Sequence, residues 1–288
     1  MTAKKKPTGK EPFHHMSAVG YKDLEDVRLR GYFTSRLGMY VTPSDGLYLE
    51  YKGELPTIAQ SKMLNYLMIL AIDHGFSPPV MAARMVTSGR PLTTTSIGVG
   101  LLAFGEAEGN GLPVSKMIQN YVRKARSEKK NLEEIAQNLV EKEGPIPPGF
   151  VHPRHPEGDP RAKGIFSRAR ELKVAGEHIR LIEMVENVMA KTLGKKIPLN
   201  FLGAASAALL DIGLTPEASY CIMIGCRAFS CGAHALEETE RESPWRASVY
   251  KGNITDILDL SLQGSQYYDG PPKREVPKDR WPGLSYSE

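Results

Sequence analysis

Apolar side chains recur every three or four residues along most of this chain, a spacing typical of amphipathic helices. The pattern is clear between residues 174 and 188, where Val174, Leu181, Val185 and Val188 follow it. It also predicts helices over 78–88, 93–105, 112–126, 131–142 and 160–171. We find no run of alternating apolar and polar residues that would indicate strands, so the predicted fold class is all-α.

Two long apolar helices are predicted from their start signals. Pro56, taken as a first helical residue, opens one that Gly75 ends, and its apolar positions cover most of its surface. We therefore expect it to be buried on nearly all sides. Thr215 as N-cap and Pro216 as first helical residue open the other. Before it, residues 200–213 are rich in small side chains, which favours close helix packing.

The segment 143–160 holds six prolines and three glycines, so it is predicted to be a loop between helices. The loop and the residue after it carry a dense set of polar side chains, His152, Arg154, His155, Asp159 and Arg161. Preorganised donors of this kind suit an anionic ligand. A metal site from two of the histidines and Asp159 is a weaker reading, because Pro153 and Pro156 prevent the helix that would align the rings.

Two further positions carry chemistry. Arg227 is the only charged residue between Glu217 and Glu237, inside a helix of apolar and small residues, so it needs an anionic partner. A structural carboxylate and a substrate carboxylate are equally compatible with this pattern. His74 follows the predicted apolar helix, where it is either a cap at the negative end of the helix dipole or a site residue.

Composition excludes several classes of protein. The 288 residues carry 37 Lys and Arg against 33 Asp and Glu, and four of the lysines lie in a basic arm, residues 1–20. We therefore do not expect a nucleic-acid binder. Cys221, Cys226 and Cys231 match neither a disulfide framework nor a metal clasp, and no apolar run reaches membrane-spanning length. We expect a soluble cytoplasmic protein in a reducing compartment, with the cysteines as small core residues.

A series of separated motifs resembles one known family. In order they are RGY at 30–32, GELPT at 53–57, AIDHGFSPPVMAAR at 71–84, GFVHPRHPEGDPRA at 149–162, NFLGAASAALLDIG at 200–213 and AHALEE at 233–238. Their order and spacing resemble the citrate synthase superfamily. Within it, the DHG form and the YDGPP tail at 268–272 look most like citryl-CoA lyases and the lyase module of ATP-citrate lyase.

The resemblance implies an all-helical citrate synthase-like fold with a cleft between two domains. It places residues 21–108 and 213–288 in a large domain and residues 109–212 in a small one. It also implies a homodimer or higher homo-oligomer, which the apolar helices near 57–74 and 216–236 would support. Gln263 lies near the sequence position at which the dimeric family has an arginine that reaches the neighbouring subunit's site.

Roles come from the resemblance only where residues match. His74 matches a histidine that contacts the oxo-acid half of the substrate, and His152 matches one that exchanges a proton with the substrate carbonyl or hydroxyl oxygen. Arg161 and Arg227 match arginines that hold carboxylates. The implied activity is carbon–carbon cleavage of a hydroxy-acyl-CoA to an acyl-CoA and an oxo-acid. The CoA thioester is the substrate, and no cofactor, metal or membrane is required.

One departure affects the acyl half of the site. The family carries a catalytic carboxylate in an NVDG-like motif, and here that motif is Asn200-Phe201-Leu202-Gly203. Leucine cannot transfer protons, so we expect Glu108 to replace the missing acid or base. The alternatives are a C–C or thioester hydrolase in which Glu108 activates water, and a non-catalytic protein that binds CoA or carboxylates.

Overall fold

The computed structural model describes residues 16–105, 108–109, 111–152, 155 and 157–244. Within them lie three strands, β1 (Gly20–Lys22), β2 (Val27–Leu29) and β3 (Tyr32–Phe33), and eleven helices. The helices are α1 (Thr34–Leu37), α2 (Pro43–Lys52), α3 (Ile58–Ala71), α4 (Pro78–Thr87), α5 (Thr93–Leu102), α6 (Gly111–Glu128), α7 (Leu132–Glu143), α8 (Pro160–Glu171), α9 (Glu177–Leu193), α10 (Phe201–Asp211) and α11 (Pro216–Arg241). The predicted all-α class is confirmed. No helix in the described part is long and apolar enough to cross a membrane.

The predicted helices over 78–88, 93–105, 112–126, 131–142 and 160–171 are present as α4 to α8, with ends that differ by at most three residues. The elements between Gly20 and Lys52, which are β1 to β3, α1 and α2, were not predicted. Strands of two or three residues are too short to show alternation, and β1 to β3 pair in antiparallel order from Gly20 to Phe33. Helix α2 does carry the signals, since Thr42 and Asp45 form a capping box around Pro43.

Helix α3 differs from its prediction at both ends. It begins at Ile58, because Thr57 and Gln60 form the capping box and Pro56 lies before the cap. It ends at Ala71, and it is buried along one side only, since Ile58 and Ile69 are exposed. Residues 72–77 therefore form a turn between α3 and α4, with Gly75 at φ +62°. This turn carries His74.

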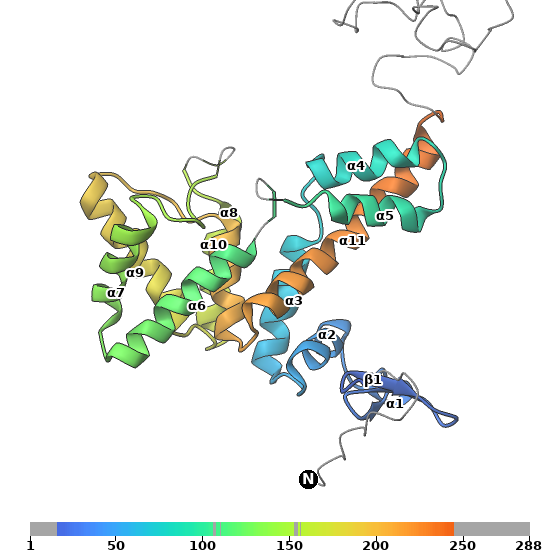
Figure 1. Cartoon of the computed structure of the whole chain (residues 1–288), viewed down its shortest axis with the longest axis horizontal. Coiled ribbons are helices and arrows are strands. Elements are labelled where there is room, and N and C mark those ends of the chain that lie inside the picture. The colour runs from blue at the N-terminus through green and yellow to red at the C-terminus, as the bar shows by residue number, and fades with distance from the viewer. Residues whose placement is uncertain (1–15, 106–107, 110, 153–154, 156, 245–288) are drawn as a thin grey trace, which may run out of the picture.

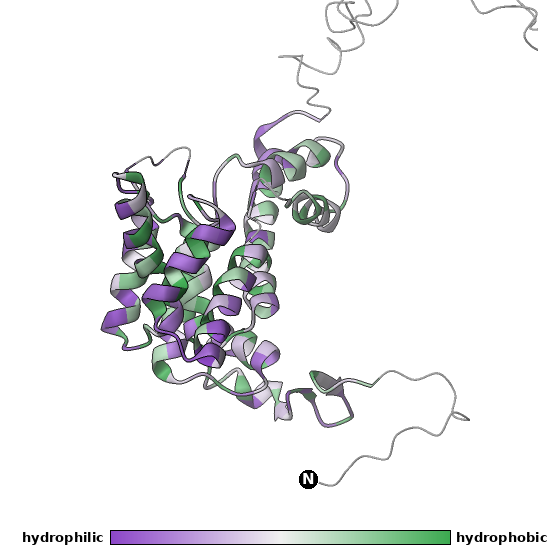
Figure 2. Ribbon diagram, turned by 60° about the vertical axis from the view of Figure 1, so that its left-hand side comes forward, coloured by the Kyte–Doolittle hydropathy of each residue, from purple (hydrophilic) through white to green (hydrophobic). Residues whose placement is uncertain are grey.

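The helices form two groups that meet along α11 (Figure 1). Helices α6 to α10 pack together, and α4 and α5 pack on the C-terminal half of α11, while β1 to β3 and α1 lie at one end beside α2 (Figure 1). The helices have a hydrophobic and a hydrophilic side (Figure 2). The division into two domains at 108/109 and 212/213 stays a prediction. The arm up to residue 15, Arg154, Gln263 and the YDGPP tail lie outside the described residues.

Helix α10 fulfils the expectation of close packing, because every residue from Gly203 to Leu210 is buried. A Cβ at Gly203 would lie 2.4 Å from the carbonyl oxygen of Gly149 and 2.7 Å from Leu199 Cδ1. Gly149 lies in the same loop as His152, three residues before it, and its carbonyl oxygen also accepts a hydrogen bond from the Asn200 N–H. The absence of a side chain at Gly203 thus lets α10 approach the loop that carries His152.

We predict that Gly203→Ala destabilises the protein by about 1–3 kcal/mol, because the added methyl group has no room against backbone. Gly46→Ala is the matched control, since a Cβ at Gly46 in α2 meets nothing within 4 Å. Chemical denaturation measures both. Equal free energies of unfolding for the two variants would contradict this account of the packing.

Candidate active site

A cavity of about 380 Å³ lies where the 72–77 turn meets helices α6, α10 and α11. All five residues singled out from the sequence line it: His74, Glu108, His152, Arg161 and Arg227. His152 and Arg161 come from the segment 149–162, and the other three come from separate parts of the chain. The structure therefore brings the candidate residues together, while their roles stay predictions.

His74 and Glu108 both line the cavity and contact each other. Its Nδ1 lies 3.1 Å from Glu108 Oε1, and the His74 side chain is 38% exposed. Helix α3 ends three residues before His74, so the alternative reading of this histidine as a helix cap is wrong. Glu108 is placed to bond an imidazole that itself lines the cavity.

His152 sits on a constrained piece of backbone. The preceding Val151 has φ +64°, a conformation that is costly for a β-branched residue. Asn200 holds it there, because its side-chain amide donates to the carbonyl oxygens of Phe150 and Val151 at 3.2 and 3.0 Å. The His152 ring lies 6.3 Å from the His74 ring, edge to face.

The surroundings of His152 favour its neutral form. Burial lowers the pKa of His152 below its ordinary value of 6.5, Asp159 opposes this, and His155, Arg161 and His74 lower it further. An imidazole that is neutral near pH 7 can accept a proton.

Arg227 is buried at 7% exposure, and among the described residues no carboxylate oxygen lies within 4 Å of its guanidinium. Its Nη2 donates to the Ser77 hydroxyl at 3.0 Å, and the guanidinium lies 5.6 Å from the centre of the Phe104 ring. Burial lowers the pKa of Arg227, while Glu108 and Asp73 act at longer range in the opposite direction. Of the two partners considered, the structural carboxylate is absent from the described part.

Arg161 differs from Arg227 because it already has a carboxylate partner. Its Nε and Nη2 donate to the two oxygens of the buried Asp159 at 3.0 and 2.8 Å, and its guanidinium lies over the Phe201 ring. The loop residue Asp159 therefore orients Arg161. Only Nη1 of this guanidinium makes no bond to Asp159.

Part of the cavity wall is apolar. Leu202, on the first turn of α10, lines the cavity together with Leu209 and Met223. Three buried serines from three helices line the same cavity, Ser115, Ser206 and Ser219, and the Ser219 hydroxyl has no partner among the described residues. The sequence analysis missed them, although a serine in an otherwise apolar helix is a usable signal.

Three further points concern the proposed metal site, His178 and the cysteines. Within the described residues, no group of three or more His, Cys, Asp or Glu could hold a metal ion. His178 lies among apolar residues on α9, and its ring is hydrogen-bonded to Asp211, whose Oδ1 lies 2.7 Å from His178 Nδ1. Cys226 and Cys231 are buried as expected, but Cys221 is exposed.

Residues 34–248 match the family model described as citrate synthase, C-terminal domain. This chain belongs to the citrate synthase family. Among solved structures it is similar to the citryl-CoA lyase from Hydrogenobacter thermophilus, with 31% identity, a TM-score of 0.77, and coverage of 91% of this chain and 97% of that one. No curated protein sequence matches the chain.

Two more distant structures show the fold of this citrate synthase family member. An ATP citrate lyase from Methanosaeta concilii has 16% identity and a TM-score of 0.64, over 88% of this chain and 44% of that one. Citrate synthase from Thermoplasma acidophilum has 20% identity and a TM-score of 0.57, over 82% of this chain and 59% of that one. The citrate synthase-like fold predicted from the motifs is therefore confirmed.

Proposed function

We propose that this protein is a carbon–carbon lyase that cleaves a hydroxy-acyl-CoA to an acyl-CoA and an oxo-acid, or forms it in reverse. The observation that carries the proposal is the buried Arg227, which has no carboxylate partner among the described residues and lines a cavity with two histidines. A cation in this setting needs an anion. The similarity to citryl-CoA lyase supports a CoA thioester as the substrate.

The proposed reaction begins with proton transfer to His152. His152 takes the proton of the substrate hydroxyl, the hydroxyl carbon becomes a carbonyl, and the electrons of the broken C–C bond move into the thioester as an enolate. Arg227 and the Nη1 of Arg161, which does not bond Asp159, hold carboxylates, and His74 orients the oxo-acid half. These donors stabilise the developing charge without a metal or an added cofactor.

Glu108 is the proposed donor of the proton that the enolate carbon receives. It lines the same cavity and bonds His74, whereas Leu202 offers no proton at the position of the family carboxylate. The apolar wall at Leu202, Leu209 and Met223 favours a thioester partner that is bulkier than acetyl-CoA.

The same placement of Glu108 supports one alternative, a hydrolase in which Glu108 activates water. Incubation with citryl-CoA and related thioesters in ¹⁸O water, followed by mass spectrometry, separates the two reactions. We expect an acyl-CoA and an oxo-acid with no solvent oxygen in any carboxylate group. Solvent oxygen in a carboxylate product would favour hydrolysis, and no turnover of any thioester would favour a binding protein.

We predict that kcat/KM for cleavage falls as the pH drops through the pKa of His152, which lies below 6.5. The rate falls on acidification because only the neutral imidazole can accept the hydroxyl proton. A lowered pKa keeps the imidazole neutral at pH 7. A pH profile of kcat/KM checks this. A profile that rises on acidification between pH 6.5 and 5 would show that His152 is not the base.

We predict that Glu108→Gln lowers kcat by about 10²–10⁴-fold, equivalent to about 3–5 kcal/mol in the barrier, because a general acid–base group is lost. Leu202→Asp should raise cleavage of citryl-CoA by restoring the family carboxylate. Glu133→Gln, which alters an exposed carboxylate on α7, is the control. Turnover by Glu108→Gln within twofold of the control would refute the proposed replacement.

We further propose a homodimer or higher homo-oligomer. Exposed apolar side chains lie on α3 and α11, including Ile58, Ile69, Phe229 and Leu236. Faces of this kind are typical of protein interfaces. Light scattering at micromolar concentration should give at least twice the chain mass, and a stable monomer would contradict the proposal. Location in the cytoplasm stays a prediction.

A further inference from the structure

The turn between α3 and α4 is attached to α11 on both sides of His74. The Asp73 carboxylate accepts hydrogen bonds from the Ser230 hydroxyl and, at 3.2 Å, pairs with His234 Nε2. Ser77, at the other end of the turn, bonds Arg227. Ser230, His234 and Arg227 all belong to α11. His74 is thus the residue of the turn that faces Glu108, while its neighbours face α11.

His234 contacts the turn in two ways. Besides pairing with Asp73, its ring lies 5.7 Å from the ring of Phe76, at an angle of 54°. Asp73 also bonds the backbone of the turn, because its Oδ2 accepts a hydrogen bond from the Gly75 N–H at 3.0 Å. The residues immediately before and after His74 are therefore linked through one carboxylate.

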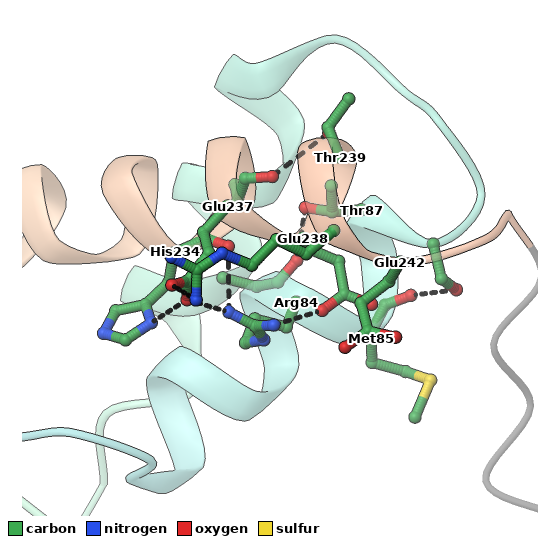
Figure 3. A network of polar contacts seen from close by, with 12 residues as sticks. Arg84, Met85, Thr87, His234, Glu237, Glu238, Thr239 and Glu242 are labelled. Carbon is green, nitrogen blue, oxygen red and sulfur yellow. Dashed lines mark hydrogen bonds and ion pairs between the residues drawn. The ribbon is translucent and has the colours of Figure 1, made fainter.

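His234 lies beside a partly buried ion network (Figure 3). Its Nδ1 lies 3.8 Å from Glu237 Oε2, and that oxygen lies 2.7 Å from Nη1 of Arg84. Arg84 also pairs with the buried Glu238 at 2.8 Å and comes from α4, the helix that follows the turn. The network therefore joins α4, α11 and the turn.

Two features distinguish this arrangement from ordinary packing. Burial alone would raise the pKa of Asp73, but hydrogen bonds from Ser230, the Gly75 N–H and His234 lower it to about 2, so it stays a carboxylate. Ser77 is the N-cap of α4, yet its side chain makes no capping bond and bonds Arg227 instead. A side-chain N-cap bond stabilises a helix, so α4 forgoes this stabilisation while Ser77 bonds the arginine of the cavity.

We propose that His234 is a positioning residue for the active site. Together with Ser230 it fixes Asp73, and through Asp73 it holds the turn in the form that aims the His74 imidazole at Glu108. This rests on the proposed function only for the role of His74 in the oxo-acid site. His234 reaches His74 through Asp73 and is not among the residues that line the cavity.

The test compares two amides at position 234. The side-chain nitrogen of His234→Gln reaches as far as the histidine Nε2 and can still bond Asp73, whereas that of His234→Asn is too short. The readout is the His74 imidazole signal in ¹⁵N-histidine-labelled full-length protein, recorded without substrate, so the result does not depend on which reaction the protein catalyses. We expect the ¹⁵N chemical shifts of the His74 imidazole to match the wild type in His234→Gln and to differ from it in His234→Asn.

His178→Asn is the matched control, because His178 forms a similar partly buried pair with Asp211 away from the cavity. It should leave the His74 signal unchanged. In a cleavage assay, His234→Asn should lower kcat by at least tenfold, and adding Asp73→Asn should cause little further loss. A wild-type His74 signal in His234→Asn, or an equal change in His178→Asn, would overturn the proposal.

Discussion

The buried guanidinium of Arg227 is the constraint on which the site depends. An unpaired buried charge strongly destabilises a protein, and among the described residues Arg227 has only the Ser77 hydroxyl and the face of Phe104 as near polar and aromatic neighbours. Carboxylates at longer range, Glu108 and Asp73, offset part of this cost. A substrate carboxylate would supply the missing partner, and the fork of an arginine is suited to bind it at two points.

The neighbouring groups can be understood from this constraint. Ser77 bonds Arg227 and leaves α4 without a side-chain cap, while Asp73 is held by α11 and stays ionised. Arg161 has the opposite arrangement, because Asp159 already neutralises it and sets its direction. Among the described residues, the site thus contains one arginine with a carboxylate partner and one without, together with His152, whose pKa is lowered by burial.

Much of the helical fold could be predicted from local signals. The Thr215 cap, the Pro216 start and the small residues of α10 act within a few positions of the chain, and the structure has them as expected. The strands at 20–33 were missed because two or three residues carry no periodicity. The end of α3 was misplaced because the sequence indicates Gly75 as the residue that ends the helix, whereas it lies in a turn that α11 holds through Asp73.

The site residues were found by motif, but their partners were not. Arg227 bonds Ser77, 150 positions away in the sequence, and His234 pairs with Asp73, 161 positions away, and no local sequence pattern predicts such pairs.

The most direct test of Arg227 as the anion site is calorimetric titration of oxaloacetate, a 2-oxo dicarboxylate, into the wild type and Arg227→Lys. We expect binding by the wild type and at least tenfold weaker binding by the variant, because a point charge does not reproduce a two-point contact. Equal affinity in the two proteins would contradict the assignment of Arg227 as the anion site.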